Sequence, residues 1–306
     1  MSNTINKIAS VEIKALWGRY DLKWDMNPDV NILSGLNGSG KSTILESIVK
    51  LIKGYDFSSK VINKVERIVV TFDNGKNISY EFMGTNFGQL NPSRGGVDIN
   101  SSLGEKLTLN IDIISTFDNE IPDIGRKPDE NVKTELDRDI FKLQKLYLDY
   151  QLNIGKKKDL AIENEEKPRE AVEKIKYPQN RFLDIIDFLF SETDKKINRA
   201  KNEIVFNIGE QEITPYQLSS GEKQILVILL TVLVQDNKPS IIFMDEPEIS
   251  LHFDWQKKLI GYILELNPNV QIILATHSPG LVLEGWRDKV KEVRDLIVFD
   301  KLAPKK

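Results

Sequence analysis

Cysteine is absent from this chain of 306 residues. Without cysteine, neither a disulfide framework nor a thiolate metal site can form, and such a composition suits a reducing cytoplasm. Histidine is scarce as well, since the chain has two. The first residues lack the apolar core of a signal peptide, and no apolar run is long enough to cross a bilayer. We therefore expect a cytoplasmic protein without a membrane partner.

Long hydrophobic runs and an excess of either charge are also missing. The most apolar stretch, residues 225–234, covers ten residues, which favours a buried core helix. Lysine and arginine total 42 against 46 aspartates and glutamates, for a net charge of −4. This balance argues against a strongly basic nucleic-acid module, but it leaves open a local basic groove and DNA as a partner. The length allows one large domain or a core with an inserted lobe.

What the chain does have is a phosphate-binding pattern at residues 35–43, where G-L-N-G-S-G-K-S-T fits G-x-x-x-x-G-K-[ST]. Glycines let the backbone curl, so that successive N–H groups point at an anionic oxygen. Lys41 can then reach the terminal phosphates of a nucleotide, and the hydroxyl of Ser42 can bind magnesium. Residues 30–33 indicate a strand entering the loop, and residues 44–52 an amphipathic helix leaving it. The expected nucleotide-binding residues are Asn37, Gly38, Ser39, Gly40, Lys41, Ser42 and Thr43.

Aromatic and basic side chains lie just upstream of this loop, at Trp17, Arg19, Tyr20 and Trp24. One of them could stack on the adenine of a bound nucleotide. Packing within the first sheet is the alternative, and it is favoured because aromatic residues are common in strands and cores.

The remaining N-terminal residues indicate a sheet. Residues 8–16 and 29–33 have strand character, and residues 67–72 and 77–82 flank an Asn-Gly turn that predicts a hairpin. Residues 106–115 indicate a further strand. We expect a mixed, partly antiparallel sheet around the phosphate loop.

An inserted helical lobe is expected for residues 120–200. Residues 134–152 carry a helical apolar stripe, and residues 178–197 predict a second helix that is too apolar to stand alone. Between them, residues 155–176 are dense in lysine and glutamate, which favours a solvated face or a mobile loop over a partner contact. No heptad persists for several repeats, so a long antiparallel coiled coil is not expected.

Sheet character returns at residues 203–213, and the sequence L-S-S-G-E-K-Q at 218–224 then opens an apolar helix. Ser219 and Gly221 supply a hydroxyl, a close backbone approach and a positive helix end, which together can bind an anion. The alternative for these residues is an ordinary helix N-cap.

Two buried strands end in polar side chains. Residues 240–245 form an apolar strand that ends at Asp245 and Glu246, and residues 271–275 form another that leads to His277. Ligands of open α/β sheets bind at such strand ends. Asp245 is placed to hold magnesium, Glu246 to deprotonate an attacking water, and His277 to contact a terminal phosphate.

Taken in order and spacing, these four motifs resemble those of the ATP-binding-cassette (ABC) ATPases. The resemblance implies an α/β P-loop fold with a mixed sheet, an antiparallel subdomain and the inserted lobe. Its divisions fall at 1–119, 120–200 and 201–306. It also implies a head-to-tail dimer with two sandwiched ATPs, in which Ser219 and Gly221 of one chain contact the γ-phosphate held by Lys41 of the other. By the same resemblance, the magnesium ligands are Ser42 and Asp245, the general base is Glu246 and the switch is His277.

The segment D-E-P-E-I-S-L-H at 245–252 is similar to that of the OLD-like ABC ATPases, which recur in defence systems such as Septu and PARIS and are relatives of SMC and RecF-type repair ATPases. Two features depart from that pattern. The magnesium-contacting glutamine has no clear counterpart among Gln89, Asp118 and Asn119. About thirty residues follow His277, so we expect no nuclease domain of the kind that OLD-like proteins carry.

We therefore expect an ATPase whose ATP-driven dimerisation controls a separate effector protein, such as a nuclease or toxin, in phage defence or DNA maintenance. Two alternatives remain. One is the nucleotide-binding subunit of a membrane transporter. It is disfavoured because residues 245–252 replace the Ser-Ala-Leu-Asp loop that is usual in such subunits. The other is an ATP-locked scaffold with little hydrolysis, which the presence of Glu246 and His277 disfavours.

Overall fold

A computed structural model describes residues 5–54, 65–82, 95–96, 109–114 and 130–302. The chain forms two compact units, each built from separate stretches of sequence. The P-loop unit comprises residues 1–113, 239–246 and 271–306, and the helical unit comprises residues 114–238 and 247–270. The expected divisions at 119 and 200 stay a prediction, and residue 119 lies outside the described ranges.

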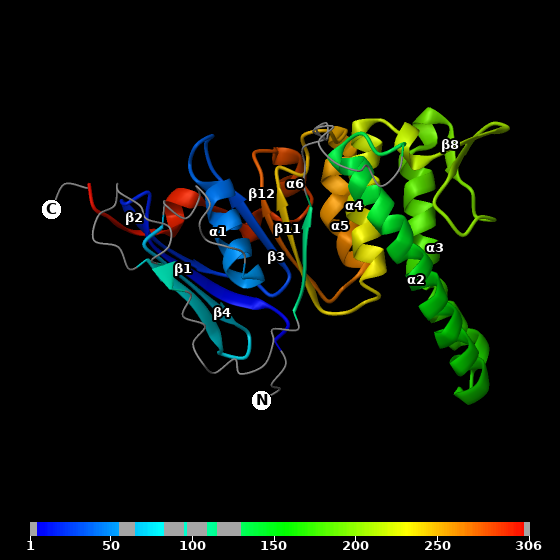
Figure 1. Ribbon diagram of the computed structural model, residues 1–306, viewed down its shortest axis with the longest axis horizontal. Coiled ribbons are helices and arrows are strands. Elements are labelled where there is room, and N and C mark those ends of the chain that lie inside the picture. Colours follow the sequence, from blue (N-terminus) through cyan, green and yellow to red (C-terminus); the bar gives the residue numbers. More distant parts are fainter. Residues whose placement is uncertain (1–4, 55–64, 83–94, 97–108, 115–129, 303–306) are drawn as a thin grey trace. The chain divides into compact units, whose positions relative to one another are not determined.

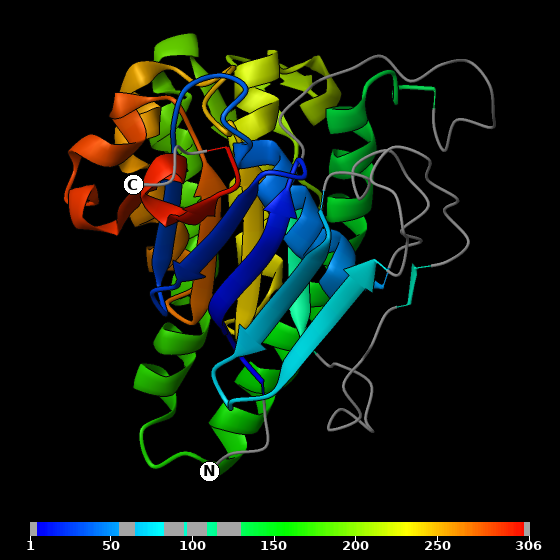
Figure 2. The same ribbon diagram turned by 90° about the vertical axis from the view of Figure 1, so that its left-hand side faces the viewer.

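An antiparallel sheet in the P-loop unit confirms the expected subdomain. Its strand order is β14-β2-β1-β4-β5-β6. The predicted hairpin joins β4 to β5, with Arg67 opposite Glu81 and Thr71 opposite Asn77. Alternate residues of the strands are buried, so that one face covers the core. Figure 2 shows this sheet from its open side. The strands are β1 (Ile8–Leu16), β2 (Tyr20–Asp25), β4 (Arg67–Phe72), β5 (Asn77–Phe82), β6 (Gly95–Gly96) and β14 (Ile297–Asp300).

The second sheet of this unit carries the loop. Its order is β13-β3-β12-β11-β7, and β3 pairs in parallel with both β12 and β13. Every residue of β12 is buried, as are the first five of β11, which explains why these strands lack a polar face. The strands are β3 (Val30–Ser34), β7 (Asn110–Ile114), β11 (Ser240–Asp245), β12 (Val270–Ala275) and β13 (Val290–Glu292).

Helix α1 (Lys41–Lys53) contacts both sheets of the P-loop unit. It touches β4 and β5 of the antiparallel sheet and β11 of the other, so one core serves both sheets. The apolar residues predicted to form its inner face are all buried: Ile44, Leu45, Ile48, Val49, Leu51 and Ile52. The short elements of this unit are α6 (Pro279–Leu283), η5 (Arg287–Lys289) and η6 (Val293–Leu296).

The described residues of the helical unit form four α-helices and a small sheet. Helix α4 is buried nearly all round from Glu222 to Leu233, which confirms the expected core helix. Helices α2 and α3 pack against each other and against α4, and their far ends extend past α4 and α5 in Figure 1. The elements are α2 (Glu135–Asn164), α3 (Pro168–Leu189), α4 (Ser220–Val234), α5 (Phe253–Leu266), β8 (Lys195–Ile197), β9 (Phe206–Ile208), β10 (Gln211–Ile213), η3 (Ser191–Thr193) and η4 (Pro215–Gln217).

Both long helices of this unit differ from their predicted bounds. Helix α2 continues through the lysines at 156–158 to Asn164, because a solvated face does not end a helix. Helix α3 begins at Pro168 and continues through Pro178. A proline is tolerated at the first helical position because the backbone N–H there has no partner within the helix. It then ends at Leu189 instead of near 197, before a turn in which Asp194 has a φ of 53°. Among the described residues, no helix is long and apolar enough to span a membrane.

Candidate functional site

The phosphate loop connects the end of β3 to the start of α1. Its backbone reverses tightly, with a hydrogen bond from Ser39 N to Leu36 O at 3.0 Å. Helix α1 begins beyond Gly40, whose φ of 103° and ψ of 7° place it in a region that residues with a Cβ rarely adopt. Asn37 and Gly38 are exposed at the tip, and Ser42 is exposed in the first turn of α1. The loop therefore presents backbone N–H groups and a helix N-terminus on its open side.

The loop has two further local features, and the first of them fits a bound phosphate group. The hydroxyl of Ser39 is buried and has no hydrogen-bond partner among the described residues, so a donor is available inside the loop. The position above Gly40 is closed, because an added Cβ there would lie 2.6 Å from Cη2 of Trp17. The indole of Trp17 thus lies directly on the last turn of the loop.

Lys41, Glu246 and His277 meet beside the loop. The ammonium of Lys41 donates to Gly35 O at 3.2 Å, lies 3.4 Å from Oε1 of Glu246 and forms a short contact with Nε2 of His277. Glu246 in turn lies 3.3 Å from Nε2 of His277 and accepts a hydrogen bond from the backbone N–H of His277 at 3.1 Å. Lys41 is 5% exposed, so its charge is held by these contacts more than by water. Three residues predicted from separate motifs therefore occupy one place.

Glu246 has a constrained backbone. Its φ is +50°, a left-handed conformation that costs a non-glycine residue about 1–3 kcal/mol. A hydrogen bond from Glu246 N to Ala275 O, at 2.8 Å, holds this conformation and joins the ends of β11 and β12. The strained turn directs the carboxylate towards Lys41 and His277 instead of along the strand.

Asp245 precedes Glu246 at the end of β11 and lies beside Ser42. Burial raises the pKa of Asp245, and a hydrogen bond with the Ser42 hydroxyl offsets part of this rise. A carboxylate and a hydroxyl are both oxygen donors that magnesium accepts. These two residues therefore fit the predicted magnesium site. The three candidates for the magnesium-contacting glutamine, Gln89, Asp118 and Asn119, lie outside the described residues.

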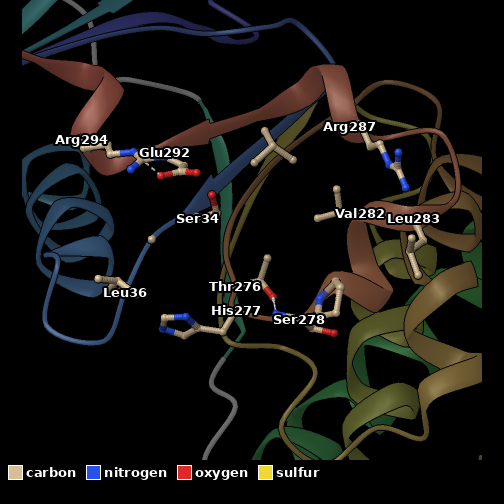
Figure 3. A pocket seen from close by; sticks show the side chains of 13 residues that line it. Ser34, Leu36, Thr276, His277, Ser278, Val282, Leu283, Arg287, Glu292 and Arg294 are labelled. Atoms are coloured by element: carbon tan, nitrogen blue, oxygen red, sulfur yellow. Dashed lines mark hydrogen bonds and ion pairs between the residues drawn. The ribbon is translucent and has the colours of Figure 1, made fainter.

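A cavity of about 630 Å³ adjoins the loop on the side of α6. In Figure 3, His277 and Leu36 lie on one side of it, and Arg287, Val282 and Leu283 lie across from them. Leu36 is 85% exposed at the edge of this cavity.

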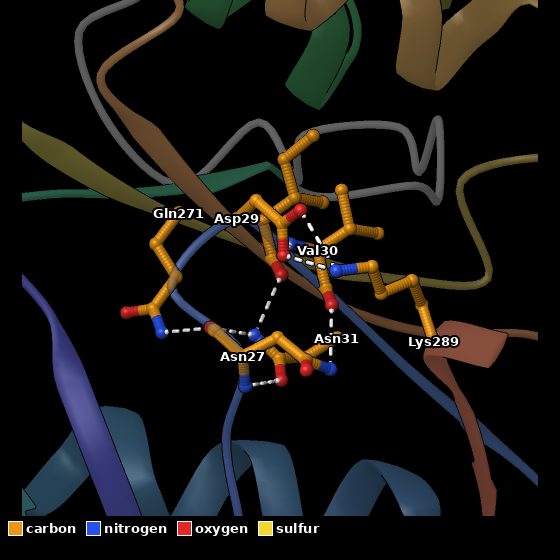
Figure 4. Close-up of polar contacts among 7 residues, drawn as sticks. Asn27, Asp29, Val30, Asn31, Gln271 and Lys289 are labelled. Carbon is orange, nitrogen blue, oxygen red and sulfur yellow. Dashed lines mark hydrogen bonds and ion pairs between the residues drawn. The ribbon is translucent and has the colours of Figure 1, made fainter.

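Buried polar side chains fix the opposite end of the strands that carry the site. The amide of Gln271, which is fully buried, accepts from Ile8 N and donates to Ile8 O and Asn27 O, each at 2.8 Å. Asp29 pairs with Lys289 through two contacts of 2.8 Å. Figure 4 shows how these side chains surround the first residues of β3. The network joins β1, β3 and β12 at one end. It thereby fixes the register of the strands whose other ends carry the site.

The predicted second anion site lies in the helical unit. Ser219 is the N-cap of α4 and is exposed, and its side chain accepts from Glu222 N. An added Cβ on Gly221 would lie 2.3 Å from the carbonyl oxygen of Ser250. Helix α4 can therefore approach the segment after Glu246 only because residue 221 is glycine. The observed N-cap supports both interpretations of these residues, and their contact with a nucleotide stays a prediction.

The structure distinguishes the aromatic residues upstream of the loop. Trp24 is 3% exposed and packs in the core, as the favoured alternative predicted. Trp17 is 38% exposed, has a φ of 53° and lies in the turn after β1. Its ring meets Tyr20 edge-on at 6.4 Å, and the guanidinium of Arg19 lies 4.5 Å from the centre of the Tyr20 ring. Trp17 is thus partly exposed beside the loop, whereas Trp24 is not.

The family follows from a comparison with known proteins. A family model described as "AAA domain, putative AbiEii toxin, Type IV TA system" matches residues 30–284, from the strand before the loop to the helix after His277. The chain belongs to this AAA-domain family. The match includes every predicted site residue.

Two relatives place this AAA-domain ATPase near proteins of defence systems. The Septu protein PtuA of Bacillus thuringiensis is 27% identical over 321 residues, covering 90% of this chain and 72% of that protein. "Retron Vc95 probable ATPase" of Vibrio cholerae is 32% identical over 105 residues, covering 34% of this chain and 20% of that protein. The expected relation to defence ATPases is confirmed.

The fold of the AAA-domain ATPase has counterparts among solved structures. An SMC head bound to the C-terminal winged-helix domain of ScpA aligns with a TM-score of 0.51 at 15% identity, over 91% of this chain and 92% of that one. At this identity the likeness shows the fold alone. It confirms the predicted P-loop α/β class.

Proposed function

We propose that this AAA-domain protein hydrolyses ATP within a dimer and thereby controls a separate effector protein. The observation that carries this proposal is the meeting of Lys41, Glu246 and His277 at the end of the phosphate loop. A cation for the phosphates, a carboxylate for the attacking water and a histidine for the terminal phosphate are the groups that phosphoryl transfer to water requires.

Each residue has a role that its position supports. Lys41 exchanges its contacts with Glu246 and His277 for the β- and γ-phosphates, which frees the carboxylate. Glu246 then accepts a proton from the attacking water, and His277 donates to the γ-phosphate. Ser42 and Asp245 would hold magnesium, which would supply positive charge beside the phosphates. The partly exposed indole of Trp17 is the side chain on which we propose that the adenine ring stacks.

The proposed dimer rests on the predicted second anion site. Ser219 and Gly221 lie at the N-terminus of a helix of fifteen residues, where Ser219 is exposed and the helix end attracts negative charge. In the proposed dimer, this end of one subunit contacts the γ-phosphate bound by Lys41 of the other. Hydrolysis removes that contact and releases the pair.

The effector is proposed from the family resemblance. Similarity to a Septu protein over 90% of this chain supports a role in phage defence. By the same resemblance, we propose a nuclease or toxin as the controlled partner. DNA maintenance, which the motif resemblance to repair ATPases implies, is the second setting that we propose.

A Glu246→Gln substitution tests the proposal. It keeps the size of the side chain but removes the proton acceptor, so we expect hydrolysis to fall by about 10²–10⁴-fold. The variant should accumulate as a dimer in ATP and magnesium, as measured by analytical ultracentrifugation. Glu284→Gln, at an exposed position after α6, is the matched control and should behave as wild type.

Two results would contradict the proposal. A Glu246→Gln variant that binds ATP but stays monomeric would exclude the dimer. Retained tight ATP binding by Lys41→Ala would exclude the assigned loop. Turnover of the wild type, measured with and without DNA, separates an active ATPase from an ATP-locked scaffold.

A further inference from the structure

The hydroxyl of Ser219, which the proposed function directs at a γ-phosphate, has a partner within its own subunit. It donates a hydrogen bond to Oε2 of Glu222 at 2.9 Å, and the backbone N–H of Ser219 donates to the same oxygen at 2.9 Å. Glu222 is 3% exposed, whereas Ser219 is exposed. The buried carboxylate of Glu222 thus accepts the hydrogen bond of the exposed Ser219 hydroxyl.

Glu222 is itself held by the segment that follows α3. Its Oε1 accepts from Oγ1 of Thr193 and from Nζ of Lys195, each at 2.9 Å. Burial alone raises the pKa of Glu222, but the hydrogen bonds from Ser219, Lys195 and Thr193 outweigh burial and keep this pKa below its ordinary value. The group is therefore an anion at neutral pH, and the bond from the Ser219 hydroxyl is charge-assisted.

A hydroxyl carries a single proton, so Ser219 can donate to one acceptor at a time. To donate to a γ-phosphate, it must first leave Glu222. The carboxylate also repels an arriving phosphate, and Lys195 reduces that repulsion by neutralising the charge. Through both effects, Glu222 disfavours the contact between Ser219 and the γ-phosphate of the other subunit.

We propose that Glu222 is a latch that restrains Ser219 until a second subunit presents ATP, and that Lys195 and Thr193 set its strength. This inference rests on the proposed function. It makes Glu222 a positioning residue, since it acts through Ser219 and touches no nucleotide. Because Thr193 and Lys195 directly follow α3, the base of the α2–α3 hairpin adjusts how much ATP the dimer requires.

Two substitutions with opposite expected signs test the latch. Glu222→Gln keeps the helix cap, because glutamine suits the third position of a capping box, but it replaces a charged acceptor with a weaker neutral one. We expect the concentration of a non-hydrolysable ATP analogue that gives half-maximal dimer to fall by about three- to tenfold. Lys195→Met leaves the carboxylate without its neutralising charge, and we expect that concentration to rise by about three- to tenfold.

The measurement is sedimentation of the full chain at increasing concentrations of the analogue with magnesium. Glu192→Gln, an exposed position beside Thr193, is the matched control and should leave the curve unchanged. Binding of a fluorescent ATP analogue to the monomer should be the same in all variants, because Glu222 and Lys195 do not belong to the phosphate loop. Thr193→Val, an exposed position with one bond to the latch, is a milder second variant that should raise the required concentration about twofold.

A role in folding alone would move Glu222→Gln and Lys195→Met in the same direction, and that result would overturn the latch. An unchanged or higher requirement in Glu222→Gln would overturn it too. A wild type that never dimerises would instead contradict the proposed function, so the two failures are distinguishable.

Discussion

Gly40→Ala probes the contact between the phosphate loop and Trp17. The φ of 103° at this position is strained for alanine, at a cost of about 1–3 kcal/mol. The new Cβ would also lie 2.6 Å from Cη2 and 3.1 Å from Cζ2 of the indole, so the ring must move. Overpacking of this kind costs about 1–3 kcal/mol. We therefore expect the free energy of unfolding to fall by about 2–6 kcal/mol.

A double-mutant cycle separates the two contributions. Trp17→Ala in the Gly40→Ala background removes the collision but leaves the backbone strain, so the two substitutions should couple by about 1–3 kcal/mol. Gly75→Ala is the matched control in the same unit, because its φ is +82° and no atom lies within 4 Å of an added Cβ. It should show the backbone cost alone.

Urea unfolding curves provide these free energies. If Gly40→Ala costs no more than Gly75→Ala, the indole does not press on the loop. If Trp17→Ala fails to recover stability in the Gly40→Ala background, the collision contributes nothing, and the position of Trp17 beside the loop is wrong.

Two further substitutions test buried polar contacts. Gln271→Met leaves the buried N–H and C=O of Ile8 without their amide partner, so we expect the free energy of unfolding to fall by about 2–5 kcal/mol. Gln211→Met, at an exposed position, is the control and should lower it by less than ~0.5 kcal/mol. Equal losses in the two variants would contradict the network. Asp137→Asn removes the 2.7 Å ion pair with buried Lys223 and should cost about 3–5 kcal/mol at pH 7. Burial raises the pKa of Asp137, but its hydrogen bonds lower it below the ordinary 3.8, so this stability is present above pH 3.8 and is lost as the pH falls through the folded-state value. The difference between wild type and Asp137→Asn, measured by urea unfolding from pH 7 downwards, should shrink below that pH, and a constant difference would refute the assignment.

The site was predictable from sequence where local geometry dictates it. The strand, glycine loop and helix around Lys41 follow from one motif, and the motif fixes their order in space. Glu246 and His277 end two apolar strands, and neighbouring strands of such a sheet bring their ends together. Their contacts with Lys41 are therefore a consequence of the pattern.

The predictions that were wrong or undecided concern residues whose placement depends on packing with residues distant in the sequence. Pro178 indicated a helix start, but α3 passes through it because Phe182, Ile185 and Ile186 are buried on its inner face. Trp17 and Trp24 were interpreted together from the sequence, but Trp17 lies in the turn after β1 and is partly exposed, whereas Trp24 lies in β2 and is buried.

The Glu222 latch contains one residue that the sequence could identify and two that it could not. The spacing Ser-x-x-Glu at 219–222 is a capping-box pattern and could have identified Glu222 from sequence. Its partners Thr193 and Lys195 lie 29 and 27 residues away, and no local pattern links them to it.

Gly221 changes how the serine-glycine motif is to be interpreted. A side chain there would strike the carbonyl of Ser250 at 2.3 Å, so the glycine is required for the helix to dock within its own subunit. This close approach gives the glycine a packing role that does not depend on a nucleotide. A loss of activity in Gly221→Ala would therefore follow from a displaced helix alone and would not by itself identify a nucleotide contact.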